Sequence, residues 1–194
     1  MFNFTLSLTI YCVIHSILAD SKIMGRVYYS WWYRFFYVVQ SVVLLLPVLY
    51  FYHTMPSEIF FKPNLPQKNF LNIIFVSAIT FGLYAVRSYD NASFLGLTQV
   101  KAKLNGEEYT YEKPTLTKKG ALAVVRHPYY TASLVAIWAR PLAVKDLYLN
   151  ILLTLYFLLG TINEERKLKK EFGQEYLDYM KEVPALVPFF KLRR

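Results

Sequence analysis

The stretch that decides the fold lies at residues 128–165 and reads PYYTASLVAIWARPLAVKDLYLNILLTLYFLLGTINEE. It contains two apolar blocks, Pro128–Leu142 and Leu147–Ile162, with only Ala143–Asp146 between them. Lipid offers no hydrogen-bond partner to a backbone amide, so each block is expected to be helical inside a bilayer. The short connection predicts a tight helical hairpin whose two outer ends return to the same membrane face.

Three more apolar blocks precede this hairpin, at Phe2–Ala19, Tyr33–Tyr52 and Phe70–Val86. The hydrocarbon core is about 30 Å thick and is crossed by about 20 helical residues, which all three blocks approach. The 194 residues are 55% hydrophobic and only 18% charged, whereas soluble domains average about 45–50% and about 25%. The composition excludes a disordered chain and predicts an all-α integral membrane protein with about five transmembrane helices.

Two segments outside the apolar blocks, residues 87–127 and 163–194, are expected to be cytoplasmic. Residues 1–86 hold three predicted transmembrane helices, 87–127 a loop, 128–162 the hairpin and 163–194 a tail. In the loop, Asn105–Gly106 is a turn signal, and the alternation over Glu107–Tyr111 allows a short β-hairpin. In the tail, a juxtamembrane amphipathic helix lying on lipid is predicted from one apolar stripe, which consists of Leu168, Phe172, Tyr176, Tyr179 and Val183.

The net charge of +9 is distributed between the apolar blocks. This placement favours a membrane-topology signal over nucleic-acid binding, and no nucleic-acid partner is expected. Most Lys and Arg residues follow the first and third blocks or lie in the tail. The positive-inside rule then puts the N-terminus outside and the C-terminus in the cytoplasm. The single cysteine, Cys12, excludes an internal disulfide framework and a Cys-based zinc site, and no metal is expected.

The first cluster that could carry chemistry is Arg126-His127, directly before Pro128. Proline disfavours a helical conformation in the residue before it and suits the first helical turn. His127 is therefore expected at the start of a helix, on the cytoplasmic side. An Arg-His pair at a helix N-terminus suits an anion or a hydroxyl group. An interfacial anchor, with the arginine reaching into the headgroups, explains the same residues equally well.

The second cluster is Glu164-Glu165, just after the fifth apolar block. Two carboxylates at a membrane exit are costly unless they are solvated or paired. One interpretation is a solvated helix, with Glu165 and Lys169 paired one turn apart. The other is that one carboxylate turns inward to pair with a buried cation. Because the hairpin is short, this cluster and Arg126-His127 are expected to line one pocket.

The C-terminal half resembles the isoprenylcysteine carboxyl methyltransferase and phospholipid methyltransferase superfamily, which are integral-membrane enzymes that use S-adenosylmethionine. The resemblance rests on Arg126-His127-Pro128-x-Tyr130, Glu164-Glu165-x-x-Leu168, Phe172-Gly173-x-x-Tyr176-x-x-Tyr179 and Val183-Pro184. The N-terminal half resembles the NnrU-like and methanethiol S-methyltransferase branch, through His15-Ser16, Tyr33-Arg34, Leu46-Pro47 and Arg87-Ser88-Tyr89-Asp90. The family often has glycine where this chain has Ala132.

The resemblance implies one membrane-embedded methyltransferase-like domain over residues 1–194, with S-adenosyl-L-methionine as cofactor. Its implied acceptor is a small or lipophilic thiol, and its other partner is membrane lipid. An isoprenylcysteine carboxylate or a phospholipid amine remains open as acceptor. The implied cofactor-binding residues are His127, Pro128, Tyr130 and Glu164. The implied catalytic residues are Arg126 and Glu165, with Arg126 anchoring a carboxylate, pairing with a glutamate or lowering the pKa of the thiol.

Three residues are weaker candidates for the substrate side. Arg87 and Asp90 follow the third block, where a loop ion pair of little net energy is the better explanation. His15 is an ionisable group inside the first block and so a functional candidate, although a neutral histidine hydrogen-bonded between helices is equally expected. A haem-binding NnrU-like isomerase or redox protein, with His15 and His127 as axial ligands, is an alternative function. A non-catalytic membrane scaffold is another.

Overall fold

The computed structural model describes residues 1–108 and 115–189. The contacts divide the chain into two compact units. The N-terminal unit comprises Met1–Pro56 and Asp90–Lys113, and the C-terminal unit comprises Ser57–Tyr89 and Pro114–Arg194. The β-hairpin expected over residues 107–111 lies partly outside the described residues. The turn at Asn105–Gly106 is confirmed, with Gly106 at a φ of +77°.

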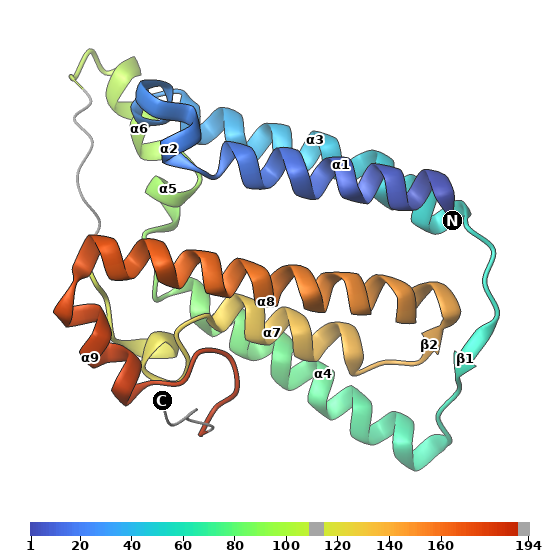
Figure 1. Cartoon of the computed structure of the whole chain (residues 1–194). Helices are drawn as coiled ribbons and strands as arrows, with labels where there is room; N and C mark the ends of the chain where they lie inside the picture. Colours follow the sequence, from blue (N-terminus) through green and yellow to red (C-terminus); the bar gives the residue numbers. More distant parts are fainter. Residues whose placement is uncertain (109–114, 190–194) are drawn as a thin grey trace. The chain divides into compact units, whose positions relative to one another are not determined.

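In the N-terminal unit, two long helices lie side by side, α1 (Phe2–Leu18) and α3 (Tyr33–Thr54) (Figure 1). The short elements of this unit are α2 (Ser21–Met24), the 3-10 helix η1 (Gly25–Tyr29), α5 (Asn91–Phe94) and α6 (Leu97–Leu104). The Tyr33 hydroxyl donates to the carbonyl of Leu18 at 2.8 Å. Arg34 Nε donates to the carbonyl of Phe94 at 2.6 Å, and its guanidinium lies 4.5 Å from the centre of the Phe94 ring. Arg34 thereby ties the α5 segment to the start of α3.

In the C-terminal unit, α4 (Leu65–Val86) packs along α7 (Pro128–Trp138), and α7 packs along α8 (Val144–Phe172) (Figure 1). The 3-10 helix η2 (Gly120–Ala123) precedes α7, and α9 (Gln174–Glu182) follows α8. Two short antiparallel strands, β1 (Ile59–Phe61) and β2 (Leu142–Ala143), pair beside the start of α8. A Cβ added to Gly82 of α4 would lie 3.3 Å from the Ala132 Cβ of α7. This close helix contact therefore has its glycine on α4, opposite Ala132 of α7.

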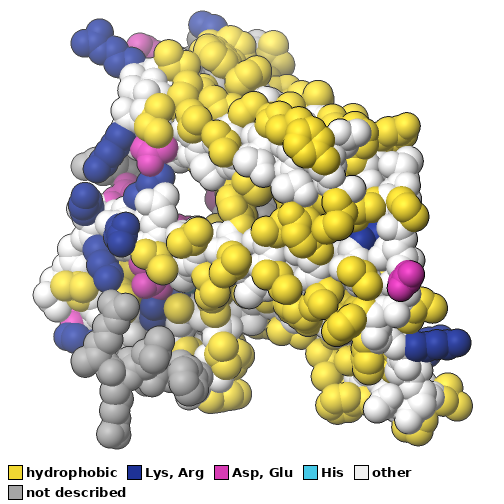
Figure 2. Space-filling view, turned by 45° about the vertical axis from the view of Figure 1, so that its right-hand side comes forward, with side chains coloured by type: hydrophobic (Ala, Val, Ile, Leu, Met, Phe, Trp, Pro, Cys, Tyr) yellow, Lys and Arg dark blue, Asp and Glu magenta, His cyan; other side chains and the backbone are white. Residues whose placement is uncertain are grey.

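Within the described residues, three helices are long and apolar enough to cross a membrane, namely α3, α4 and α8. The pair Phe2–Leu18 and Ser21–Tyr29, bent by 67°, would make a fourth span if it crosses as one. Large apolar side chains remain uncovered on these helices, with Ile73 65% and Leu159 67% exposed. Figure 2 shows hydrophobic side chains spread over the helices and many of the Lys and Arg side chains near helix ends. The all-α class and the multi-pass membrane architecture are therefore confirmed.

The expected count of about five spans is not confirmed. Helix α7 has 11 residues, which at about 1.5 Å per residue covers roughly half of the hydrocarbon thickness. It ends before Arg140 and Pro141, and Arg140 forms an ion pair with Asp146 at 3.0 Å. The predicted fourth block, Pro128–Leu142, is thus a shorter helix than expected, although the hairpin itself is present.

The predicted amphipathic helix of the tail is not one separate helix. Helix α8 continues through the polar residues to Phe172, and Gly173 breaks it at a φ of +54°, a region that glycine enters without a steric cost. The expectation that the stripe lies on lipid is wrong, because the stripe packs on protein: Tyr176 and Tyr179 are buried in a cluster with Val183, and Leu116, Leu168, Phe172 and Met180 pack against it.

Candidate functional site

The entry of α7 is held by the chain that follows α9. Pro128 takes the first helical position of α7, as predicted, and His127 is the residue before it. The backbone amide of Arg126 donates to the carbonyl of Pro184 at 2.9 Å, and that of His127 donates to the carbonyl of Ala185 at 3.1 Å. These two bonds fix the backbone of Arg126 and His127, and so the positions from which their side chains extend.

Arg126 forms a buried ion pair with Glu165. Its Nε donates to Glu165 Oε1 at 2.9 Å, and the two side chains are 7% and 13% exposed. The same guanidinium donates to the carbonyls of Met180 and Val183. Of the two adjacent carboxylates, Glu165 is therefore the one that turns inward. Arg126 uses its donors within the protein.

His127 lies between the two glutamates. Its Nδ1 is 3.4 Å from Glu164 Oε2, and its Nε2 is 3.4 Å from Glu165 Oε1. Burial disfavours the charged imidazolium, but the two carboxylates outweigh it and raise the pKa of His127 above its usual value. Glu164 keeps its side chain 47% exposed. The site thus presents one half-exposed carboxylate beside a buried histidine.

Aromatic rings flank this cluster. The Tyr130 ring stacks on the His127 ring at 5.6 Å between centroids and packs on Phe157 of α8 at 5.0 Å. On the α4 side, the rings of Tyr89 and Tyr129 stack at 5.0 Å. Burial and the nearby Glu164 carboxylate raise the pKa of the Tyr89 hydroxyl, which stays neutral. The sequence had indicated Tyr130; it gave no separate signal for the Tyr89–Tyr129 pair.

One buried hydroxyl close to this cluster, that of Thr161, has no hydrogen-bond partner among the described residues. Thr161 lies one helical turn before Glu165 on α8, and burial followed by the Glu165 charge raises the pKa of Tyr176. Unpartnered buried polar groups are few in native proteins and call for an explanation such as a ligand or water. Sequence reasoning missed Thr161, for which the one-turn spacing from Glu165 was the available signal.

The weaker candidates lie elsewhere in the fold. Arg87 is the residue that follows α4. Asp90 belongs to the N-terminal unit and caps α5, accepting from the amide of Ser93 at 3.2 Å. His15 lies on α1, where its Nε2 is 2.8 Å from the Tyr37 hydroxyl and its Nδ1 is 3.1 Å from the Ser41 hydroxyl. Both ring nitrogens of His15 thus contact a hydroxyl of α3.

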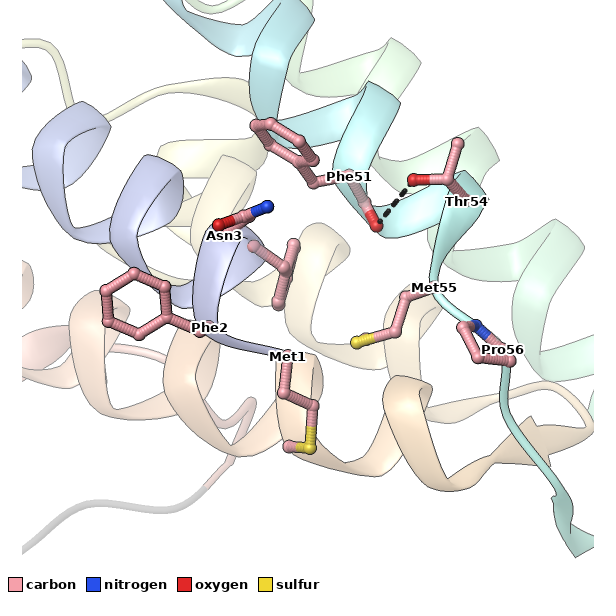
Figure 3. Close-up of a pocket in the computed structure, with 8 residues that line it drawn as sticks. Met1, Phe2, Asn3, Phe51, Thr54, Met55 and Pro56 are labelled. Atoms are coloured by element: carbon pink, nitrogen blue, oxygen red, sulfur yellow. Dashed lines mark hydrogen bonds between the residues drawn. The ribbon is translucent and has the colours of Figure 1, made fainter.

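Two cavities are found in the N-terminal unit. One, of about 320 Å³, lies where α1 begins and α3 ends, and Figure 3 shows Met1, Phe51 and Met55 around it. The other, of about 340 Å³, is lined by aromatic and charged side chains that include Trp31, Trp32 and Lys103. Neither is lined by the cluster around His127.

Searches for similar proteins give a consistent result. No protein-family profile and no solved structure matches the chain. Methanethiol S-methyltransferase 2 of Bradyrhizobium diazoefficiens is 26% identical over 97% of this chain and 73% of its own length. The methanethiol S-methyltransferases of Crocosphaera subtropica and Mycobacterium tuberculosis are 29% and 28% identical, each over 94% of this chain and over 72% and 75% of their own lengths. The chain spans about two thirds to three quarters of the length of such relatives.

The similarity extends over nearly the whole chain and therefore includes both the N-terminal helices and the cluster around His127. It agrees with the resemblance carried by the sequence motifs of the two halves. The chain is thus similar over nearly its whole length to proteins named methanethiol S-methyltransferase, which is consistent with the isoprenylcysteine carboxyl methyltransferase-like resemblance of its motifs.

Proposed function

We propose that this chain is an integral-membrane methyltransferase that transfers a methyl group from S-adenosylmethionine to a small or lipophilic thiol. The observation that carries the proposal is the meeting of Arg126-His127 with Glu164-Glu165 at one end of α7 and α8. The similarity to proteins named methanethiol S-methyltransferase supports the reaction class and the thiol acceptor.

The polar groups around His127 suit the polar end of this methyl donor. Glu164 is a half-exposed carboxylate, and we assign it to the ammonium group of the donor. The stacked His127 and Tyr130 rings form the adjoining wall, and Pro128 fixes the start of α7 beneath them. The unpartnered hydroxyl of Thr161 is a further group that a polar ligand would satisfy.

Arg126 and Glu165 act in the proposed reaction by holding this arrangement. Their ion pair is buried, and Arg126 also donates to two carbonyls at the end of α9, those of Met180 and Val183. Because each neutralises the charge of the other, the guanidinium and the carboxylate can both stay charged in this buried position. Glu165 also keeps a carboxylate next to His127, which favours the imidazolium form.

S-adenosylmethionine supplies, when bound, an electrophilic methyl group on a sulfonium. In the proposed reaction the acceptor thiol loses its proton to solvent, its sulfur forms the new bond to carbon, and the bond from carbon to the sulfonium breaks. Thiolates are strong nucleophiles, so the protein mainly has to orient the partners and exclude water.

We further propose that the site lies at the cytoplasmic face, with the N-terminus outside and the C-terminus inside, because basic residues concentrate on the side of Arg126 and the tail. A Cys12→Ser background carrying Ser57→Cys or Lys169→Cys tests this. A membrane-impermeant maleimide should label the first variant in intact cells and the second only after lysis. The reverse pattern would contradict the orientation.

The activity is tested with purified protein and donor labelled in its methyl group. The acceptor panel contains methanethiol, a longer alkanethiol, an isoprenylcysteine and phosphatidylethanolamine. We expect label in the methyl thioether of a thiol, and donor binding that is lost in His127→Ala and Glu164→Gln. Label in the isoprenylcysteine or the lipid would show that the acceptor is not a small thiol and would identify the acceptor class instead. A folded protein with no donor binding would refute the proposal.

A further inference from the structure

Polar side chains link α7 and α8 far from His127. Asn150 Nδ2 donates to the carbonyl of Ile137 at 2.7 Å. Trp138 Nε1 donates to the hydroxyl of Thr154 at 3.1 Å, and that hydroxyl donates to the carbonyl of Asn150 at 2.6 Å. We call these four residues, Ile137, Trp138, Asn150 and Thr154, the polar clamp.

The clamp occupies a place where apolar residues would be expected. Asn150 is fully buried in a largely apolar part of α8, and its Nδ2 is bonded whereas its Oδ1 has no hydrogen-bond partner among the described residues. A buried amide in a membrane helix is costly unless it is bonded. Its partner Ile137 is in the last turn of α7, where helical carbonyls lack an amide of their own helix. The Ile137 carbonyl accepts from Asn150 Nδ2 at 2.7 Å and from Arg140 Nε at 3.3 Å. The amide of Asn150 is the donor from α8 that helps to compensate for the early end of α7, which the sequence pattern did not predict.

The clamp and the site lie at matching positions on the two antiparallel helices. From Ile137 back to Tyr130 and from Asn150 on to Phe157 takes the same number of residues, about two helical turns. From Trp138 back to His127 and from Thr154 on to Glu165 also takes the same number, about three turns. One axial register of α7 against α8 thus satisfies both sets of contacts.

We propose that the polar clamp sets this register, and that Asn150 is a positioning residue for His127 between Glu164 and Glu165. Sliding one helix by a single residue moves it about 1.5 Å. That exceeds what the two 3.4 Å contacts of His127 tolerate. Apolar side chains pack in several registers, whereas the bonds from Asn150 and Trp138 are made in one. The consequence for methyl transfer rests on the proposed function; the geometric role does not.

The geometric role is tested by titrating the histidines by NMR in purified, detergent-solubilised protein without any ligand. The chain has three histidines, and His15 and His53 serve as internal references. In Asn150→Leu, we expect the pKa of His127 to fall toward its ordinary value, because the carboxylates move away. The control is Ile151→Leu, at a neighbouring position that is 46% exposed, which should leave the titration unchanged.

A second pair of variants uses a milder change. Thr154→Val removes the hydroxyl that receives the Trp138 bond at nearly constant volume, and Thr154→Ser restores it. We expect the His127 titration to shift in the first and return in the second. Circular dichroism verifies that each variant is folded. Folded Asn150→Leu and Thr154→Val proteins whose His127 titrates as in the native chain would overturn the proposal.

Donor binding then separates the two proposals. A misplacement of about 1 Å costs about 100-fold in the rate of a positioned reaction, so we expect methyl transfer by Asn150→Leu to be about 100-fold slower than by the Ile151→Leu control, with weaker binding of S-adenosylmethionine. A shifted His127 titration in a chain that binds no donor even in its native form supports the clamp and contradicts the proposed function.

Discussion

Arg126 and Glu165 form a buried ion pair between the entry of α7 and the last turns of α8, although 39 positions separate them in the sequence. The carboxylate next to it, Glu164, is 47% exposed and contacts His127. Two adjacent glutamates thus have different surroundings. The buried one completes a charge pair with Arg126, and the other keeps part of its carboxylate exposed.

Substituting each glutamate by glutamine should separate these roles. Removing one partner of a buried pair leaves an uncompensated charge, so Glu165→Gln should lower the free energy of unfolding by about 3–5 kcal/mol. Glu164→Gln should change it by less than about 1 kcal/mol, yet weaken donor binding. Denaturant unfolding and isothermal titration of the donor check both. Equal effects of the two variants on stability would refute the assignment of Glu165 as the buried partner.

The raised pKa of His127 predicts a pH dependence of stability. Its imidazolium is stabilised in the folded protein by Glu164 and Glu165, against the opposing effect of burial. A group whose pKa is higher in the folded state contributes its full stabilisation below the unfolded value of about 6.5 and loses it as pH rises through the folded value. The melting temperature should therefore fall as pH rises above 6.5.

The matched control for this pH effect is His127→Asn, which keeps a polar side chain but does not titrate. Its melting temperature should change less between pH 6 and pH 9 than that of the native protein. A native melting curve that rises over this range, or a decline of equal size in His127→Asn, would contradict the role of this histidine.

The part of the site at the beginning of α7 could be predicted from residues that are close together in the sequence. Pro128 fixes a helix beginning by its own geometry, so the position of His127 follows from the sequence. A short connection between two helices brings their outer ends together, which is why Arg126 and Glu165 could be expected to meet. These inferences depend on neighbours in sequence or on one short loop.

Features that depend on partners distant in sequence were not predictable in the same way. Helix α7 ends at Trp138, where Asn150 bonds to its last turn and Arg140 pairs with Asp146, and hydropathy does not register such bonds. The stripe at Tyr176 and Tyr179 has the spacing of a lipid-facing helix as well as of a protein-facing one. Only the surrounding chain decides between them.

The contact between α4 and α7 gives a third prediction. A Cβ on Gly82 would already lie 3.3 Å from the Cβ of Ala132, so a larger side chain has no room. Gly82→Leu should destabilise the protein by about 1–3 kcal/mol through overpacking. Val76→Leu is the control, because Val76 lies on the same helix and is 60% exposed. Similar unfolding curves for the two variants would show that α4 and α7 do not pack through Gly82.

Two glycines of the N-terminal unit allow backbone strain to be separated from a steric clash. Gly96 has a φ of +81°, and a Cβ there would lie 2.3 Å from the backbone nitrogen of Phe35. Gly106 has a φ of +77°, with nothing within 4 Å of such a Cβ. Both Ala substitutions carry the cost of a left-handed backbone, about 1–2 kcal/mol, but only Gly96→Ala also forces the α5–α6 segment away from α3. Its loss of unfolding free energy, measured by denaturant titration, should therefore clearly exceed that of Gly106→Ala, and equal losses would mean that Gly96 and Phe35 are not in close contact.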